Sequence, residues 1–189
     1  MENIIKGIRR HYCVSESSLD QLAEHLNVQY VSKNHLLTRA GVKDHSVYFI
    51  EQGCTRTFFL IDGKEVTNWF SEEGDITFSS NSLYHAASGN DYVEVLEDSL
   101  IYSISIDKLN SLYSTNLEIA NWSRVLHQEV LLKMQNLRID RLSLSAKDRY
   151  EKFFSENARL FNRVNLGHIA SYLGMTQQHL SSLRAGIRF

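Results

Sequence analysis

The chain has 189 residues, of which 43% are hydrophobic, and a formal net charge of −2 at pH 7. This length suits one large domain or two small ones, and the hydrophobic content excludes a disordered chain. No apolar run approaches the roughly 20 residues that span a bilayer, and no apolar stretch follows the basic start as in a secretory signal. We therefore expect a soluble, intracellular, cytoplasmic protein with no membrane partner.

Charge is distributed unevenly along the chain. Residues 1–137 hold 11 Lys or Arg against 18 Asp or Glu, whereas residues 138–189 hold 9 against 4. No acidic residue follows Glu156. An acidic front and a basic tail indicate that the tail contacts a polyanion. Chance clustering in a short segment is the alternative interpretation.

The first half of the chain is expected to be mainly β structure. Residues 17–27 read as a short helix with Ser17 and Asp20 as a capping box. Asp62-Gly63 is a strong hairpin signal between two strand candidates. Short strands separated by turn residues indicate an antiparallel sandwich or barrel. The expected strands cover residues 47–50, 54–61, 65–70, 76–78, 92–96 and 100–106.

A helical bridge at 107–113 is followed by a long helix that begins at Thr115, with Glu118 as its capping-box partner, and runs to about Arg138. Its wide apolar stripe needs a partner, which is either the preceding β domain or the same helix of a second copy. We favour pairing in a homodimer. The stripe consists of Ile119, Trp122, Leu126, Val130, Met134 and Leu137.

Residues 166–186, LGHIASYLGMTQQHLSSLRAG, carry the most informative pattern. Leu166–Leu173 is expected to be a helix, Gly174 a left-handed turn residue and Thr176 the cap of a second helix. Leu180 and Leu183 would pack back on the first helix. The pattern predicts a helix-turn-helix (HTH), with a plain helical hairpin as the alternative.

The exposed face of the second HTH helix carries hydrogen-bonding groups and no carboxylate. Such groups suit the base edges and phosphates of double-stranded DNA. The candidate DNA-binding residues are Thr176, Gln177, Gln178, His179, Ser181, Ser182, Arg184 and Arg188.

Signs of catalytic chemistry are weak. Cys13 and Cys54 are too few for a disulfide framework or an iron–sulfur cluster, and each reads as a small apolar side chain. His35, His45 and His85 lack the close spacing of a metal site on one strand. No phosphate-cradling glycine loop or nucleophile elbow is present. We expect no catalytic residues, no metal site and no cofactor, and keep a cupin-like metal enzyme as the least favoured alternative.

Three stretches together resemble the CRP/FNR family of bacterial transcription regulators, and most of all its short Bacteroidetes-type members. They are VYFIEQGCTRTFFLIDGKEVTNWFSEEGD (47–75), VEVLEDSLIYSIS (93–105) and IASYLGMTQQHLSSLR (169–184). The resemblance covers nearly the whole chain. It implies a cyclic-nucleotide-binding-like barrel, a long dimerisation helix and a winged HTH, with pseudo-palindromic DNA, a second copy and RNA polymerase as partners.

Family members that bind cyclic nucleotides hold the phosphate with a Gly-Glu pair and an Arg followed by Ser or Thr. Aligned from Gly74-Asp75, these positions fall on Phe78-Ser79 and Gly89-Asn90, and no Lys or Arg lies between Thr77 and Tyr92. A buried phosphate would lack its countercharge. We therefore expect no cyclic nucleotide bound in the usual way, and the effector is unknown. Candidate pocket residues, with plain barrel core as the other interpretation, are Phe70, Phe78, Ser79, Leu83, Tyr84, Gly89 and Asn90.

The predicted fold is α+β, with an antiparallel β-barrel of the double-stranded β-helix type, a long helix and a helical DNA-binding domain. The expected boundaries are 1–112 for the sensor barrel, 113–140 for the linker and dimerisation helix, and 141–189 for the HTH domain. The predicted function is a homodimeric DNA-binding transcription regulator, not an enzyme. The alternative is a ligand sensor that acts through protein partners without DNA, which fits a chain with no residues left for a wing.

Overall fold

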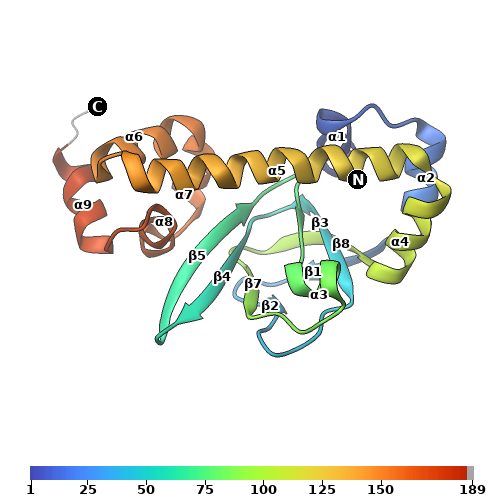
Figure 1. Ribbon diagram of the computed structural model, residues 1–189, viewed down its shortest axis with the longest axis horizontal. Helices are drawn as coiled ribbons and strands as arrows, with labels where there is room; N and C mark the ends of the chain where they lie inside the picture. The colour runs from blue at the N-terminus through green and yellow to red at the C-terminus, as the bar shows by residue number, and fades with distance from the viewer. Residues whose placement is uncertain (187–189) are drawn as a thin grey trace.

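The computed structural model describes residues 1–186, which are arranged along one long helix, α5 (Leu117–Ser143). The other helices are α1 (Glu2–His11), α2 (Glu16–Ala23), α3 (Ser80–His85), α4 (Ile106–Thr115), α6 (Ala146–Glu156), α7 (Ala158–Arg163), α8 (Leu166–Leu173) and α9 (Gln177–Gly186). Figure 1 shows α1, α2 and α4 at one end of α5, α6 to α9 at the other, and the strands beneath it.

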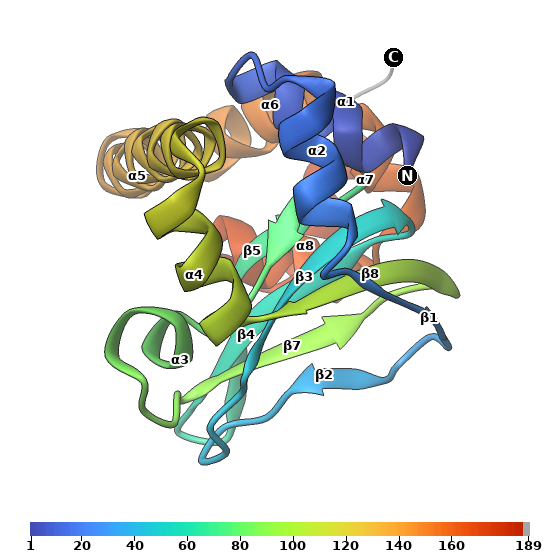
Figure 2. The same ribbon diagram turned by 90° about the vertical axis from the view of Figure 1, so that its right-hand side faces the viewer.

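The strands form two four-stranded antiparallel sheets (Figure 2). They are β1 (Asn27–Val31), β2 (Leu36–Thr38), β3 (Ser46–Gln52), β4 (Thr55–Ile61), β5 (Lys64–Ser71), β6 (Ile76–Thr77), β7 (Asp91–Val95) and β8 (Ser99–Ser105). The strand orders are β1-β8-β3-β6 and β2-β7-β4-β5. The antiparallel β fold is confirmed, but the expected closed barrel is corrected to two sheets, because each keeps two edge strands.

The β4–β5 hairpin is built as predicted. Its turn residues Asp62 and Gly63 both have positive φ, 50° and 74°, and Ile61 pairs with Lys64. Left-handed backbone at both turn positions matches the twist of the flanking strands. The hairpin therefore places β5 at a sheet edge, on the side of the C-terminal helices (Figure 1).

All six predicted strands are confirmed to within one or two residues at each end, whereas β1 and β2 were missed. In β1, Val28 and Tyr30 alternate with polar residues but are exposed, and only Val31 is buried. The predicted helix at 17–27 is corrected to Glu16–Ala23. Its cap is Ser15, whose hydroxyl accepts a hydrogen bond from the Ser18 amide, and not the expected Ser17 box.

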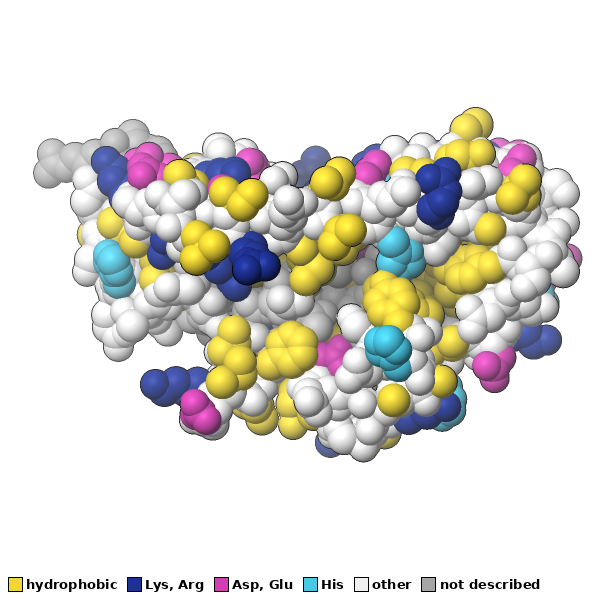
Figure 3. All heavy atoms as spheres, viewed as in Figure 1, with side chains coloured by type: hydrophobic (Ala, Val, Ile, Leu, Met, Phe, Trp, Pro, Cys, Tyr) yellow, Lys and Arg dark blue, Asp and Glu magenta, His cyan; other side chains and the backbone are white. Residues whose placement is uncertain are grey.

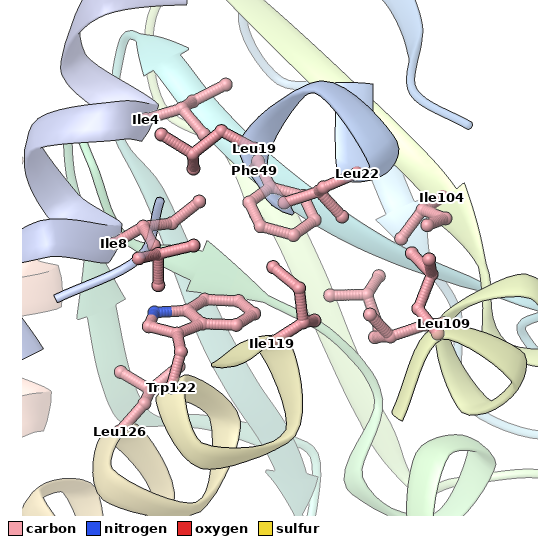
Figure 4. Close-up of a cluster of buried hydrophobic side chains, with 13 residues drawn as sticks. Ile4, Ile8, Leu19, Leu22, Phe49, Ile104, Leu109, Ile119, Trp122 and Leu126 are labelled. Atoms are coloured by element: carbon pink, nitrogen blue, oxygen red, sulfur yellow. The ribbon is translucent and has the colours of Figure 1, made fainter. Parts of the chain in front are cut away.

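The N-terminal core joins α1, α2, α4 and the sheet of β3 and β8 to the first half of α5 (Figure 4). Trp122 of α5 stacks on Phe49 of β3, with ring centroids 5.8 Å apart. Ile119, Trp122 and Leu126 are 0%, 2% and 7% exposed. These three stripe residues pack on the chain's own core, so their predicted role in pairing with a second copy is corrected.

Helix α5 starts later and ends later than predicted. Its cap is Asn116, not Thr115: the Asn116 side chain accepts hydrogen bonds from the amides of Glu118 and Ile119, each at 3.1 Å. The helix continues to Ser143, past the expected end at Arg138. It therefore carries the C-terminal helices beyond the edge of the sheets (Figure 1).

The C-terminal helices share a second hydrophobic core with the β part. Cys54, Phe70 and Leu96 from the sheets and their turns belong to the same buried cluster as residues of α6 to α9. The β part and the C-terminal helices are thus packed together. Within residues 1–186, no helix is both long and apolar enough to cross a membrane.

We predict that Gly7→Ala strongly destabilises the protein. A Cβ at Gly7 would lie 1.9 Å from the carbonyl oxygen of Gly74, where α1 crosses the β5–β6 turn, and backbone cannot yield as a flexible side chain would. Overpacking of this kind costs about 1–3 kcal/mol of unfolding free energy, measured by chemical denaturation. Gly186→Ala is the matched control, because nothing lies within 4 Å of that Cβ position. Equal stability of the two variants would contradict the packing described.

Candidate DNA-binding and effector sites

The helix-turn-helix is formed by α8 and α9, and its turn is set by local sequence. Asn165 caps α8 by accepting a hydrogen bond from the Gly167 amide at 2.7 Å. Gly174 ends α8 with φ 69°, ψ 41°, a left-handed conformation that glycine adopts without a Cβ penalty. The Met175 amide donates to the Ala170 carbonyl at 3.0 Å. The predicted bounds of the first helix, Leu166–Leu173, are confirmed.

Helix α9 is anchored to α8 by its apolar side. Leu180 is fully buried, Ala170 is 1% exposed, and Leu183 packs against the same cluster. The predicted cap is present, since the Thr176 hydroxyl accepts from the His179 amide at 3.2 Å. This packing fixes which side of α9 faces outward.

The outward face of α9 carries polar side chains and a single cation. Gln177, Gln178, His179, Ser181, Ser182 and Arg184 are all exposed, and the helix holds no carboxylate. The guanidinium of Arg184 lies over the Phe161 ring, 5.1 Å from its centroid. The Ser182 hydroxyl donates to the Gln178 carbonyl, so the hydroxyl oxygen can still accept a hydrogen bond. Arg188 lies outside the described residues.

Several cations of the C-terminal part are engaged within the chain. Arg141 donates to the Tyr172 carbonyl at 2.6 Å, and Arg149 donates to the carbonyls of Leu173 and Leu144 at 3.0 and 2.7 Å. These guanidiniums satisfy carbonyls at the ends of α8 and α5, which lack partners within their helices. They hold the HTH to the end of α5 and are less available to a ligand.

The residues predicted to form an effector pocket are dispersed. Phe70 points to the C-terminal helices, its ring 5.2 Å from that of Tyr172. Phe78 and Tyr84 meet edge to face at 5.8 Å, and both contact the His127 ring of α5. Leu83 packs on the N-terminal core, and Asn90 is exposed. The seven residues therefore do not line one pocket.

The start of α3, where the resemblance places phosphate, is occupied by a carboxylate of the chain. Asp91, 4% exposed, accepts hydrogen bonds from the Ser79 hydroxyl at 2.8 Å and the Ser80 amide at 3.3 Å. A Cβ at Gly89 would lie 2.1 Å from the same carboxylate. Donors that would hold an anion are thus already satisfied, and Asp91 would repel a phosphate.

A cavity of about 140 Å³ lies between the β5–β6 edge and α5. Of the predicted pocket residues only Phe78 lines it, together with Trp69 and residues of α5. His127 also lines it: its Nδ1 lies 2.7 Å from the Ser123 carbonyl, while its buried Nε2 has no hydrogen-bond partner among the described residues. Since a carbonyl only accepts, Nδ1 is the donor in this bond.

The side chains that could bind a metal ion are dispersed across the described residues. Across residues 1–186, no three His, Cys, Asp or Glu side chains gather closely enough to hold an ion. Cys13 is exposed and Cys54 buried, and burial raises the pKa of the Cys54 thiol to about 12, so that thiol is inert near neutral pH.

Contacts between the sensor and the HTH were not predicted from the sequence. Arg163 of α7 pairs with glutamates of the sensor, and Ser171 of α8 hydrogen-bonds the backbone of β5. In the sequence, Arg163 is one of several cations of the basic tail, and Ser171 is one of several polar residues of the HTH segment. No local pattern identifies such partners, which lie 66 to 106 residues apart in the chain.

Comparison with known proteins supports the domain order. Residues 28–116 match the family model of the cyclic nucleotide-binding domain. The HTH-type transcriptional regulator ArcR of Staphylococcus aureus is 24% identical over 166 residues, which cover 81% of this chain and 70% of that protein.

Solved structures share the fold at low identity. The c-di-GMP responsive global regulator CLP of Xanthomonas campestris superposes with TM-score 0.76 at 14% identity, covering 90% of each chain. FixK2 of Bradyrhizobium japonicum gives 0.71 at 18%, covering 85% of this chain and 83% of that one. A regulator from Eubacterium rectale assigned to the CRP/FNR family gives 0.71 at 16%, covering 90% and 82%. The resemblance found in the sequence is confirmed for the domain and the architecture.

Proposed function

We propose that this chain, a protein of the CRP/FNR type by its domain and architecture, is a homodimeric DNA-binding transcription regulator and not an enzyme. The observation that carries the proposal is the exposed, carboxylate-free face of α9 on a well-formed helix-turn-helix. In the proposed division, residues 1–112 sense, 113–140 link and dimerise, and 141–189 bind DNA. Contact with RNA polymerase is an implication of the family alone.

In the proposed complex α9 enters the major groove with its N-terminal end first. Gln177 and Gln178 lie in its first turn, and an amide side chain can pair with N6 and N7 of adenine. The side-chain Oε1 of Gln177 lies 2.9 Å from the position that a Cβ would take at Gly167, so this side chain leans toward the start of α8. Gln178 is therefore the better candidate for base readout, and Thr176, His179, Ser181, Ser182 and Arg184 for phosphate or neighbouring bases.

We predict that the protein binds a labelled random-sequence duplex with an affinity that falls linearly with salt on a logarithmic scale. Arg184→Ala should weaken binding and reduce the salt slope by about 1, because one phosphate contact is lost. Fluorescence anisotropy across a salt series measures both. Arg39→Ala, an exposed cation of the sensor, is the matched control and should leave the slope unchanged. Absence of binding at low salt by the folded protein would favour a sensor that acts through protein partners.

The surface proposed for dimerisation is the outer face of α5, opposite the side that packs on the core. Leu131, Leu132, Ile139 and Leu142 are 67%, 59%, 50% and 78% exposed. Their spacing puts them on one side of the helix. Figure 3 shows hydrophobic side chains exposed along α5. An apolar stripe of this length on a soluble helix supports pairing with the same stripe of a second copy.

We predict that Ile139→Glu raises the dissociation constant of the dimer by about tenfold or more, because it buries an unpaired charge in an apolar interface. Sedimentation velocity over a concentration series measures this. Met134→Glu is the matched control on the same helix, since Met134 is 43% exposed but lies beside the cavity on another side. A dimer that survives Ile139→Glu but not Met134→Glu would contradict the proposed face.

The sensor is proposed not to take a cyclic nucleotide in the usual way. Support comes from the Asp91 carboxylate at the start of α3 and from the lack of any Lys or Arg between Thr77 and Tyr92. An effector, if it uses the cavity beside α5, would meet the rings of Trp69, Phe78 and His127.

We predict no saturable heat when cyclic AMP or cyclic GMP is titrated into the protein by calorimetry. The unpaired phosphate charge would face the buried Asp91 carboxylate. The free-energy cost of this repulsion would exceed the free energy gained from the remaining contacts. A dissociation constant below about 1 mM, which corresponds to −4.1 kcal/mol, would contradict this.

A further inference from the structure

The HTH domain is joined to α5 by two extended residues, Leu144 and Ser145. A short extended connection of this kind is where rigid parts can rotate relative to one another. The position of α8 and α9 therefore depends on side-chain contacts. The bond from Arg141 to the Tyr172 carbonyl holds α8 to α5, and two further contacts hold the C-terminal helices to the β part.

The first such contact is made by Ser171 of α8 with the free edge of β5. The Thr67 amide donates to the Ser171 hydroxyl at 2.9 Å, and the same hydroxyl donates to the Glu65 carbonyl at 2.9 Å. β5 pairs only with β4, so these backbone groups face outward from the sheet. One serine oxygen thus satisfies a donor and an acceptor of an edge strand, as a neighbouring strand would.

The second contact is a cluster of three sensor glutamates around Arg163 of α7. The guanidinium binds Glu73 through two parallel bonds of 2.7 and 2.9 Å, bonds Glu97 as well, and lies 3.5 Å from Glu72. Glu73 also accepts from the Gly53 amide at 2.8 Å, which fixes it to the sensor. Bidentate pairing within a network is the arrangement in which a partly exposed ion pair contributes to stability.

The charge balance of this cluster opposes DNA binding. Three carboxylates surround one guanidinium. Glu73 and Glu97 raise the pKa of Arg163, and burial raises the pKa of Glu72. Arg163 precedes the cap of α8 by two residues, in the part of the chain whose cations would meet phosphate. When α8 is docked on β5, the Arg163 guanidinium is paired with these glutamates, and an acidic patch lies beside the HTH.

The junction between these two contacts is not closely filled. A cavity of about 410 Å³ lies between β5, α5, α6 and α8, with Trp69, Phe70, Phe153 and Tyr172 on its walls. The hollow is open to solvent, and beside it Phe70 packs on the C-terminal helices, so this apolar packing and the contacts of Ser171 and Arg163 together hold the junction closed.

We propose that Ser171 on the edge of β5 and Arg163 in its glutamate cluster form an autoinhibitory latch between the sensor and the HTH, and that releasing it raises the affinity for DNA. The inference rests on the proposed function. Release frees Arg163 and removes the carboxylates from the DNA-facing domain, while the bond from Arg141 to Tyr172 keeps α8 beside the end of α5. Because the latched and free forms are in equilibrium, weakening either contact shifts the population toward the free form.

The test uses the full chain with Ser171→Ala, which changes no charge, and the double variant Glu73→Gln, Glu97→Gln. Loss of hydrogen bonds of ordinary net strength corresponds to roughly fivefold in an equilibrium constant. We expect the affinity for a random-sequence duplex to rise about fivefold in Ser171→Ala and about tenfold in the double variant. Acrylamide quenching of fluorescence should rise as well, because Trp69 lines the junction while Trp122 stays buried.

Matched controls separate latch release from other effects. Ser155→Ala removes a hydroxyl on the exposed side of α6, and Glu16→Gln with Glu24→Gln removes two charges at α2, at the opposite end of α5. Both should behave as the wild type. A junction that opens without a gain in DNA affinity would overturn the latch. So would latch variants that match the wild type in both DNA affinity and quenching, or a control variant whose DNA affinity rises as much as theirs. Binding by the latch variants alone would support it most strongly, whereas no binding by any protein at low salt would overturn the proposed function together with the latch.

Discussion

The packing of Trp122 and its neighbours on Phe49 is the contact on which the rest of the molecule depends. It fixes α5 both along its axis and about it. With Ile119 and Leu126 turned into the core, the opposite face with Leu131 and Ile139 is left without a partner, and the last turns of the helix extend past the sheets. One buried interface thereby determines which face of α5 stays exposed and where the HTH domain is held.

The C-terminal domain uses its charges in two different ways. Within the chain, the guanidiniums of Arg141 and Arg149 bond carbonyls at helix ends, and the guanidinium of Arg163 bonds glutamates of the β part. The outer face of α9 is left with amides, hydroxyls and Arg184. In the proposed latch, the residues that build the domain junction also set how much positive charge the domain offers to DNA.

Residues 28–116 match the family model of the cyclic nucleotide-binding domain, and the fold of these residues depends on apolar packing and on turns. Anion binding depends on a few polar groups at the start of α3. There Asp91 takes the hydrogen bonds of Ser79 and Ser80 that an incoming anion would need. Fold and ligand chemistry can diverge because they are carried by different residues.

Sequence alone determined what depends on neighbours in the chain: the six short strands separated by turn residues, the Asp62-Gly63 hairpin, and the helix-turn-helix with its Gly174 turn and Thr176 cap. It also identified the polar face of α9, because helical spacing decides which side chains share a face. Tertiary structure alone decided which face of α5 is buried, since that helix has apolar residues on two sides and only packing on Phe49 selects one of them. It also brought Arg163 to Glu73 and Ser171 to β5. These pairs are remote in sequence and formed by ordinary polar residues, so only the folded chain places them together.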